Sequence, residues 1–153
     1  MRAFKDDRNR AYNDVFPEIG KGDINISRLY PGTIKAFHRH ALQDDYWFVI
    51  KGNLRAVLAK PDPTKVTVSV TTTFPFANNL QFSEIKPQMH ISEHYLSEGD
   101  ILHIPAGVWH GLQVLGYEEA IMLYHITNKY NPDKPDEERA PWNAFHTWEF
   151  SKK

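Results

Sequence analysis

The chain has 153 residues, a formal net charge of −1 with His neutral, and no cysteine. This length suits one domain with a core of its own, and the lack of cysteine excludes disulfides, thiolate nucleophiles and thiolate metal ligands. The charges are interspersed and no apolar run approaches the ~18 residues of a membrane span, so we expect a single cytoplasmic domain over 1–153 that binds neither nucleic acid nor membrane.

Strands are predicted where β-branched and aromatic residues cluster between turn residues. Residues 1–30 are expected to form an N-terminal arm with strands. Further strands are predicted at 46–50, 54–59, 65–73, 100–105 and 120–127. No long helical period occurs, and turn sequences such as Pro61-Asp62-Pro63 recur at short intervals. This pattern predicts an all-β sandwich or barrel.

Two stretches lie outside this regular pattern. Residues 74–98 contain strand-like and loop-like pieces and allow no finer assignment. The segment 128–153 is rich in Pro and charge. We expect it to form a surface tail from which Trp142 and Trp148 dock back onto the barrel.

Four polar side chains form the strongest chemical signal. His38 and His40 are two residues apart, so in a strand they project from the same face of the sheet. Asp45 can return to that face on the next strand, and His110 arrives from a distant part of the chain. The sequence therefore predicts a pocket lined by these four residues.

Their spacing matches two known sequence motifs nearly position for position. The first runs from Gly32 through His38 and His40 to Asp45 and Gly52, and the second runs from Gly99 through Pro105-Ala106-Gly107 to His110. Both resemble the motifs of cupins, with Asp45 in place of the usual Glu and Val114 in place of the usual final Asn. The resemblance implies a cupin double-stranded β-helix, or jelly-roll barrel.

Two chemistries remain open for this constellation. His38, His40, Asp45 and His110 could bind a divalent transition metal with open coordination positions. A metal-free pocket could equally use a histidine as general base, with a carboxylate that fixes its tautomer. A metal-free mechanism without a cofactor is the leading expectation.

A longer resemblance points to one family. The segments GTIKAFHRHALQDDYWFVIKGNLRAVL, LHIPAGVWHGLQVLG and LYHITNKYNPDKPDEERAPWN resemble the dTDP-4-dehydrorhamnose 3,5-epimerase family in motifs, order and spacing. In that family a His removes a proton alpha to the ketone of a 4-keto-6-deoxy sugar, and a Tyr returns a proton from the other face. The resemblance places these catalytic roles on His38 and Tyr124.

The chain also departs from the family pattern. Lys35 stands where the family has Arg, Asp45 falls near the family's oxyanion-stabilising Lys, and WNA at 142–144 replaces W-N-D. From the resemblance we expect no counterpart here of the distal segment that carries the Asp partner of the catalytic His in longer members. We therefore expect Asp45 or Asp44 to serve as that partner, and Lys35 or His110 to stabilise the enolate.

The resemblance also suggests substrate-binding residues. The N-terminal segment resembles one in which an Arg holds a diphosphate, which points to Arg8 or Arg10. Tyr130 resembles a ring that lines the sugar site, and Trp47 shares the face of Asp45 and is expected to stack on a ligand.

Three functions follow as hypotheses. The leading one is a nucleotide-sugar epimerase or isomerase of the dTDP-4-dehydrorhamnose 3,5-epimerase type in polysaccharide biosynthesis. The second is a metal-dependent cupin enzyme, and the third is a sugar-binding cupin without catalysis. The family resemblance further implies a homodimer.

Overall fold

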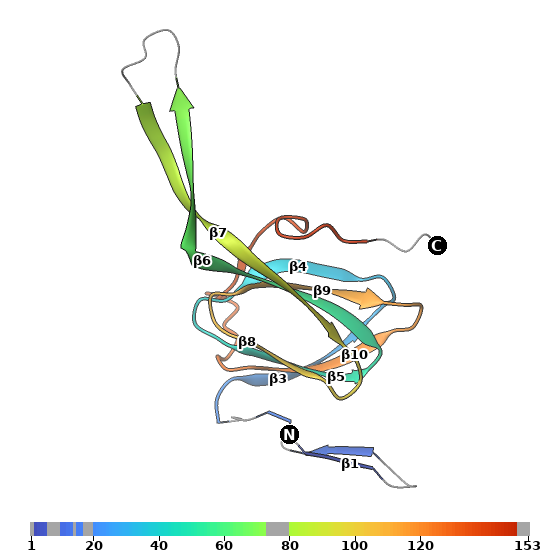
Figure 1. Ribbon diagram of the computed structural model, residues 1–153. Coiled ribbons are helices and arrows are strands. Elements are labelled where there is room, and N and C mark those ends of the chain that lie inside the picture. Colours follow the sequence, from blue (N-terminus) through green and yellow to red (C-terminus); the bar gives the residue numbers. More distant parts are fainter. Residues whose placement is uncertain (1, 6–9, 14, 17–19, 73–79, 150–153) are drawn as a thin grey trace.

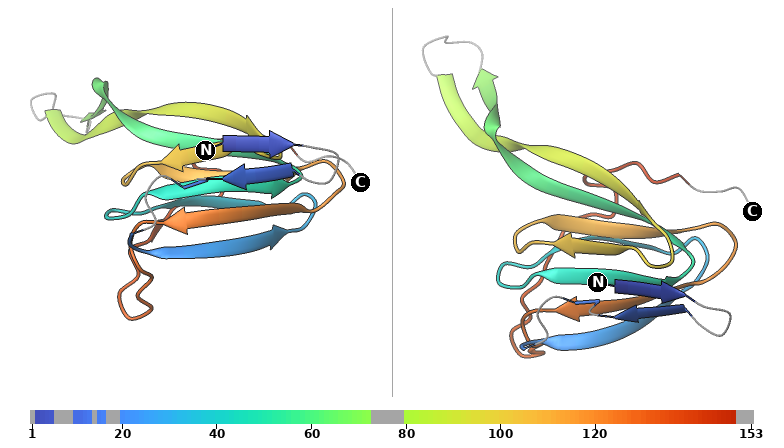
Figure 2. Two further views of the ribbon diagram at one scale, coloured as in Figure 1. Left: turned by 90° about the horizontal axis from the view of Figure 1, so that it is seen from below. Right: turned by 60° about the horizontal axis from the view of Figure 1, so that its bottom comes forward.

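The structure is a computed structural model that describes residues 2–5, 10–13, 15–16, 20–72 and 80–149. Two antiparallel sheets face each other (Figures 1 and 2). The four-stranded sheet has the order β3 (Asp23–Leu29), β10 (Ala120–Ile126), β5 (Asp45–Lys51) and β8 (Ile101–Ile104). Strands distant in sequence are thus neighbours in space, as the jelly-roll prediction requires.

The five-stranded sheet has the order β11 (Glu138–Arg139), β4 (Ile34–Arg39), β9 (Trp109–Leu115), β6 (Asn53–Thr72) and β7 (Leu80–Leu96). A separate hairpin pairs β1 (Arg2–Lys5) with β2 (Arg10–Asn13). The prediction of an all-β cupin barrel is confirmed. In the part of the chain that the structure describes, we find no helix with the length and hydropathy to span a bilayer.

The main core fills the space between the two sheets. Alternate residues of each strand point inward, so Trp47 and Val49 of β5 meet Leu54 and Ala56 of β6. All four side chains are buried. Three of its members, Trp47, Leu112 and Met122, also line the pocket described below.

A second apolar cluster covers the outer face of the five-stranded sheet. Phe37, Val57 and Trp148 are its buried members. The Trp148 indole also donates a 2.7 Å hydrogen bond from Nε1 to the carbonyl oxygen of Trp142. Trp148 therefore docks on the barrel as expected, whereas Trp142 remains 49% exposed.

The longest hairpin corrects one sequence prediction. Residues 54–59 and 65–73 were expected to be two strands separated by a turn at Pro61-Asp62-Pro63. Instead β6 runs on through this segment, with a shift in its register against β7 between Asp62 and Val66. Prolines are tolerated in a strand at such an irregularity, where Thr64 donates its backbone N–H to the Asp62 carboxylate at 3.0 Å. The β6–β7 hairpin consequently projects beyond the barrel (Figure 1).

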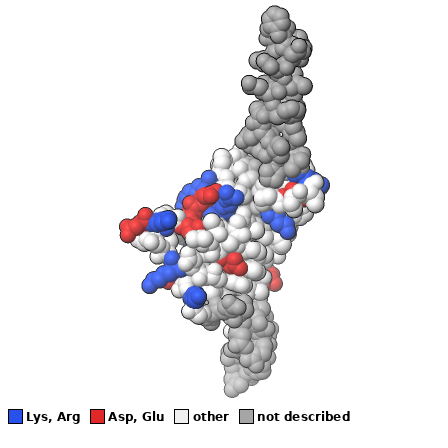
Figure 3. Space-filling model, turned by 90° about the vertical axis from the view of Figure 1, so that its left-hand side faces the viewer, with Lys and Arg blue, Asp and Glu red and all other residues white. Residues whose placement is uncertain are grey.

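Charged side chains are mixed on the surface. On the face shown in Figure 3, basic and acidic side chains lie next to one another and form no broad field of one sign. This view agrees with the interspersed charges of the sequence.

Candidate active site

A pocket of about 1220 Å³ opens between the two sheets. Small-molecule sites commonly enclose roughly 300–1,000 Å³, so this pocket has room for a ligand of several rings. The four-stranded sheet contributes residues of β3, β5 and β10, and the five-stranded sheet contributes β4 and β9. The remaining wall comes from the β4–β5 turn, with His40, Leu42 and Gln43, and from residues after β10.

We call residues 128–140, which form the part of this wall that follows β10, the strap. The strap leaves β10 and lines the pocket with ten of its residues: Asn128, Lys129, Tyr130, Asn131, Lys134, Pro135, Asp136, Glu137, Arg139 and Ala140. Its end forms β11, where Arg139 pairs with His38 of β4. The expectation of a surface tail did not include this role as a pocket wall.

Three histidines meet at the inner end of the pocket, where His38 and His40 line it and buried His110 contacts His38 without being one of the lining residues. The ring centroid of His38 lies 4.2 Å from that of His110 and 5.3 Å from that of His40. One ring nitrogen from each of the three can be chosen so that all lie within 4.8 Å of one another. The H-x-H spacing thus places both histidines on one face as predicted, and β9 delivers His110 opposite His38.

Backbone carbonyls set the proton positions on two of these rings. His110 Nδ1 lies 3.0 Å from the carbonyl oxygen of Val108, and His40 Nδ1 is in close contact with that of Asp136. A carbonyl only accepts hydrogen bonds, so in a neutral imidazole Nδ1 carries the proton and Nε2 keeps a lone pair. In their neutral forms, both rings present an unprotonated Nε2.

Asp45 completes the cluster from the four-stranded sheet. Its Oδ2 lies 3.7 Å from Nε2 of His110, and its Oδ1 accepts a 3.0 Å hydrogen bond from Gln43. Both carboxylate and imidazole are buried. The structure therefore brings Asp45 to His110, whereas the other acid considered, Asp44, binds His103 and the backbone N–H of Ala106 outside the cluster.

Burial keeps two of the histidines neutral. Desolvation, followed by the charges of His110, His40, Lys35 and Arg139, lowers the pKa of His38 to about 3. Burial also lowers the pKa of His110, although Asp45 and the Val108 carbonyl oppose that shift. Neutral imidazoles are needed both for a general base and for metal ligands.

The residues present fit a divalent transition metal. Nε2 of His110 is buried and has no hydrogen-bond partner among the described residues, which is unusual for a buried polar atom. Two of the rings donate their other N–H to carbonyls, as metal-binding histidines commonly do. His38, His40 and His110, with Asp45 beside them, could therefore hold such an ion.

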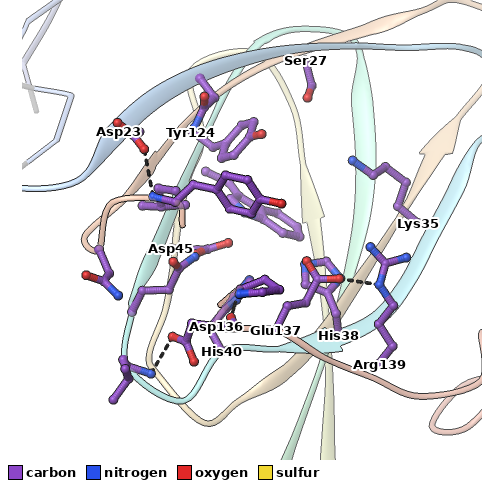
Figure 4. A pocket seen from close by; sticks show the side chains of 18 of the residues that line it. Asp23, Ser27, Lys35, His38, His40, Asp45, Tyr124, Asp136, Glu137 and Arg139 are labelled. Carbon is purple, nitrogen blue, oxygen red and sulfur yellow. Dashed lines mark hydrogen bonds and ion pairs between the residues drawn. The ribbon is translucent and has the colours of Figure 1, made fainter. Parts of the chain in front are cut away.

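Lys35 enters the pocket from the five-stranded sheet. It pairs in register with Leu112, a core residue, so its side chain faces the barrel interior. No carboxylate of the described residues forms an ion pair with it. Figure 4 shows its ammonium group directed into the pocket, with Arg139 beside it.

The predicted aromatic residues also line the pocket. Tyr124 of β10 is half-buried against the core, and Figure 4 shows it across the pocket from His38. Trp47 packs edge-on against His110 with ring centroids 5.6 Å apart, so it supports the histidine cluster as well as lining the pocket. Tyr130 lies on the strap and is 62% exposed.

Two predicted residues lack a described side chain. Arg8 lies outside the described residues, and Arg10 is described only through its backbone in β2. Their assignment to a diphosphate stays a prediction. Sequence reasoning missed Asp136, Glu137 and Arg139, for which the charged run PDEER at 135–139 was the available signal.

The double antiparallel sheet with a histidine cluster in its pocket defines a cupin-type protein. A solved dTDP sugar isomerase from Desulfovibrio desulfuricans has the same fold, with a TM-score of 0.67, 20% identity, and coverage of 94% of this chain and 82% of that one. The capsular polysaccharide assembling protein CapF from Staphylococcus aureus matches with a TM-score of 0.54 and 18% identity, over 78% of this chain and 26% of its own.

Sequence comparison identifies relatives. The spore coat polysaccharide biosynthesis protein SpsL of Bacillus subtilis is 36% identical over 124 residues, which are 80% of this chain and 69% of SpsL. The chain belongs to the same protein family as SpsL. A probable low-salt glycan biosynthesis epimerase of Haloferax volcanii is 29% identical over 118 residues, 76% of this chain and 64% of that protein. No family model matches the chain.

Proposed function

We propose that the protein is an epimerase or isomerase of nucleotide-linked keto sugars that works by proton transfer alpha to the ketone. The names of the glycan biosynthesis epimerase and the dTDP sugar isomerase support this reaction class. The observation that carries the proposal is the placement of neutral His38 and the Tyr124 hydroxyl on opposite walls of one pocket.

This placement suits inversion at a carbon next to a ketone. His38 removes the proton from one face of the sugar, and the electron pair moves onto the ketone oxygen as an enolate. Tyr124 then donates its phenolic proton to the opposite face of the same carbon, which inverts the centre. Two groups on one wall could only return the proton to the face it left.

Enolate formation needs positive charge near the ketone oxygen. Lys35 supplies an ammonium group that no carboxylate of the described residues pairs with, in the same pocket wall as His38. Its charge also contributes to the low pKa of His38. The negative charge of the forming enolate, beside Lys35, offsets the lowering of the His38 pKa by the ammonium group. His38 therefore becomes a stronger base as the enolate forms.

Size favours an extended substrate, and ammonium groups of the pocket lining offer partners for its anionic part. Lys35 lies beside His38, and Lys129 and Lys134 of the strap also line the pocket, whereas Arg139 is ion-paired with Glu137. The lining also contains the carboxylates of Asp23, Asp45 and Asp136. Sugar nucleotides carry a diphosphate that ammonium groups bind. The volume of about 1220 Å³ exceeds the need of a single hexose ring.

The test is turnover of 4-keto-6-deoxy sugar nucleotides by variants of the two proposed catalytic residues. His38→Asn and Tyr124→Phe should each lower kcat by about 10²–10⁴-fold, as expected for loss of a general base or acid. Tyr117→Phe is the matched control, because Tyr117 is 85% exposed. Unchanged turnover in both pocket variants would refute the assigned roles.

A metal-dependent reaction is the second candidate, and the unpartnered Nε2 of buried His110 favours it. His38, His40, His110 and Asp45 would hold the ion, which would act as a Lewis acid toward a substrate oxygen. His38 cannot be a metal ligand and a free base through the same nitrogen. Metal content therefore separates the two candidates.

A further inference from the structure

The strap makes three hydrogen bonds to the turn that follows β4 and begins with His40, all through a single residue. The carboxylate of Asp136 accepts the backbone N–H of Ala41 at 2.9 Å with Oδ1 and that of Leu42 at 2.8 Å with Oδ2. Its own carbonyl oxygen receives Nδ1 of His40. Asp136 therefore clamps the turn after His40 while it also contacts the ring of His40.

The carbonyl contact determines which nitrogen of His40 faces the pocket. With Nδ1–H donated to Asp136, the lone pair of the neutral ring lies on Nε2. Figure 4 shows Asp136 next to His40 on the wall opposite Tyr124. His110 receives the equivalent contact from Val108, two residues earlier and just before β9, whereas His40 depends on a residue 96 positions along the chain.

The carboxylate holds that carbonyl in place. Without the carboxylate, Asp136 would lose its two charge-assisted hydrogen bonds to the β4–β5 turn, and its backbone carbonyl would no longer be tied to that turn. Both bonds are exposed to solvent, so water could replace them for Ala41 and Leu42. Loss of the carboxylate should therefore disturb the position of His40 more than the stability of the fold.

We infer that Asp136 is a positioning residue that fixes His40 as the Nδ1–H tautomer, with Nε2 directed at the histidine cluster. It acts through His40 and not on the substrate. The inference deepens the proposed site and rests on it for its role in function. The state of His40 can be measured whether or not a keto sugar is turned over.

The first test is the tautomer of His40 in ¹⁵N-histidine-labelled protein, read from two-bond ¹H–¹⁵N correlations and assigned by comparison with His40→Asn. The wild type should show His40 protonated on Nδ1, and Asp136→Ala should lose this preference. Asp136→Asn retains one acceptor oxygen and should keep part of the preference of His40 for the Nδ1–H tautomer. Asp133→Ala is the control, because exposed Asp133 lies on the same strap and does not line the pocket.

The second test is Zn²⁺ binding by the same proteins, followed by calorimetry. Loss of a group that orients a metal-binding histidine typically weakens affinity by about 10–100-fold, and we expect this for Asp136→Ala but not for Asp133→Ala. If wild-type His40 carries its proton on Nε2, or if folded Asp136→Ala keeps the wild-type tautomer, the inference is wrong. If Asp136→Ala does not fold, Asp136→Asn gives the same comparison. Failure of the wild type to bind Zn²⁺ would reject the metal candidate and leave the tautomer result decisive.

Discussion

Oδ2 of Asp45 lies 3.7 Å from Nε2 of His110, although the two residues belong to different sheets. Each is buried, and each would be costly to bury without a partner. The contact joins the two halves of the barrel at the base of the pocket. Nε2 of neutral His110 keeps a lone pair, so the two groups lie close together without a hydrogen bond, and the acid of the cluster lies beside His110.

Removal of the pocket ammonium tests the proposed stabilisation of the enolate. Lys35→Met keeps the length of the side chain and removes its charge, so kcat should fall by about 10²–10³-fold while the fold is retained. Lys51→Met, at an exposed position at the end of β5, is the control. Steady-state kinetics on a keto sugar nucleotide measure the effect, and a Lys35→Met enzyme with wild-type kcat would exclude this role.

Metal content separates the two proposed chemistries. Protein purified without an affinity tag or added metal should contain little transition metal if His38 is the base. About one equivalent, lost in His40→Ala and retained in His103→Asn, would instead establish the metal-dependent candidate. His103 lies outside the cluster, paired with Asp44 at 2.8 Å, which makes it a suitable control for elemental analysis.

The lowered histidine pKa values predict how stability depends on pH in chelator-treated protein. Unfolded His38 would protonate near its ordinary pKa of 6.5, while the folded state stays neutral down to about 3. The contribution of neutral His38 to the free energy of unfolding is therefore complete above pH 6.5 and is lost as the pH falls from there toward 3, by about 1.4 kcal/mol per pH unit. Chemical denaturation between pH 4 and 7 measures this slope.

A variant isolates the contribution of His38. His38→Asn cannot bind the proton in either state, so its stability should fall less steeply with decreasing pH than that of the wild type. His90→Asn, at an exposed position on β7, should keep the wild-type slope. Equal slopes for His38→Asn and the wild type would show that His38 titrates alike in both states.

Trp148 tests whether the C-terminal segment is part of the folded unit. Its ring is 3% exposed and packs on Phe37 with centroids 5.6 Å apart. Trp148→Ala should lower the free energy of unfolding by about 3–5 kcal/mol, as for other buried aromatic residues. Trp142→Ala is the comparison and should cost less, because Trp142 is 49% exposed. Denaturant titration gives both values.

Local spacing made part of the site predictable. His38 and His40 are two residues apart, and the alternation of a strand places them on one side without any knowledge of the fold. His110 required the second motif, because β9 is paired with β4 only after the barrel has closed. The long β6 was missed because a Pro-Asp-Pro sequence is typical of a turn, and tertiary pairing with β7 overrides that preference here.

The role of the strap could not be predicted in the same way. Asp136 contacts His40 through a backbone carbonyl, which every residue has, so no side-chain type marks the contact in the sequence. The pairing of Arg139 with His38 likewise depends on where the chain returns after β10. Such long-range backbone contacts become visible only in the structure.

The central claim is proton abstraction alpha to a ketone by His38, and solvent deuterium incorporation tests it most directly. The wild type, incubated in D₂O with a 4-keto-6-deoxy sugar nucleotide, should place deuterium on a carbon that flanks the ketone. Tyr124→Phe should retain exchange with little inverted product, because His38 can still remove and return a proton on its own face. His38→Asn should abolish the exchange, whereas exchange in His38→Asn at the wild-type rate would contradict the account.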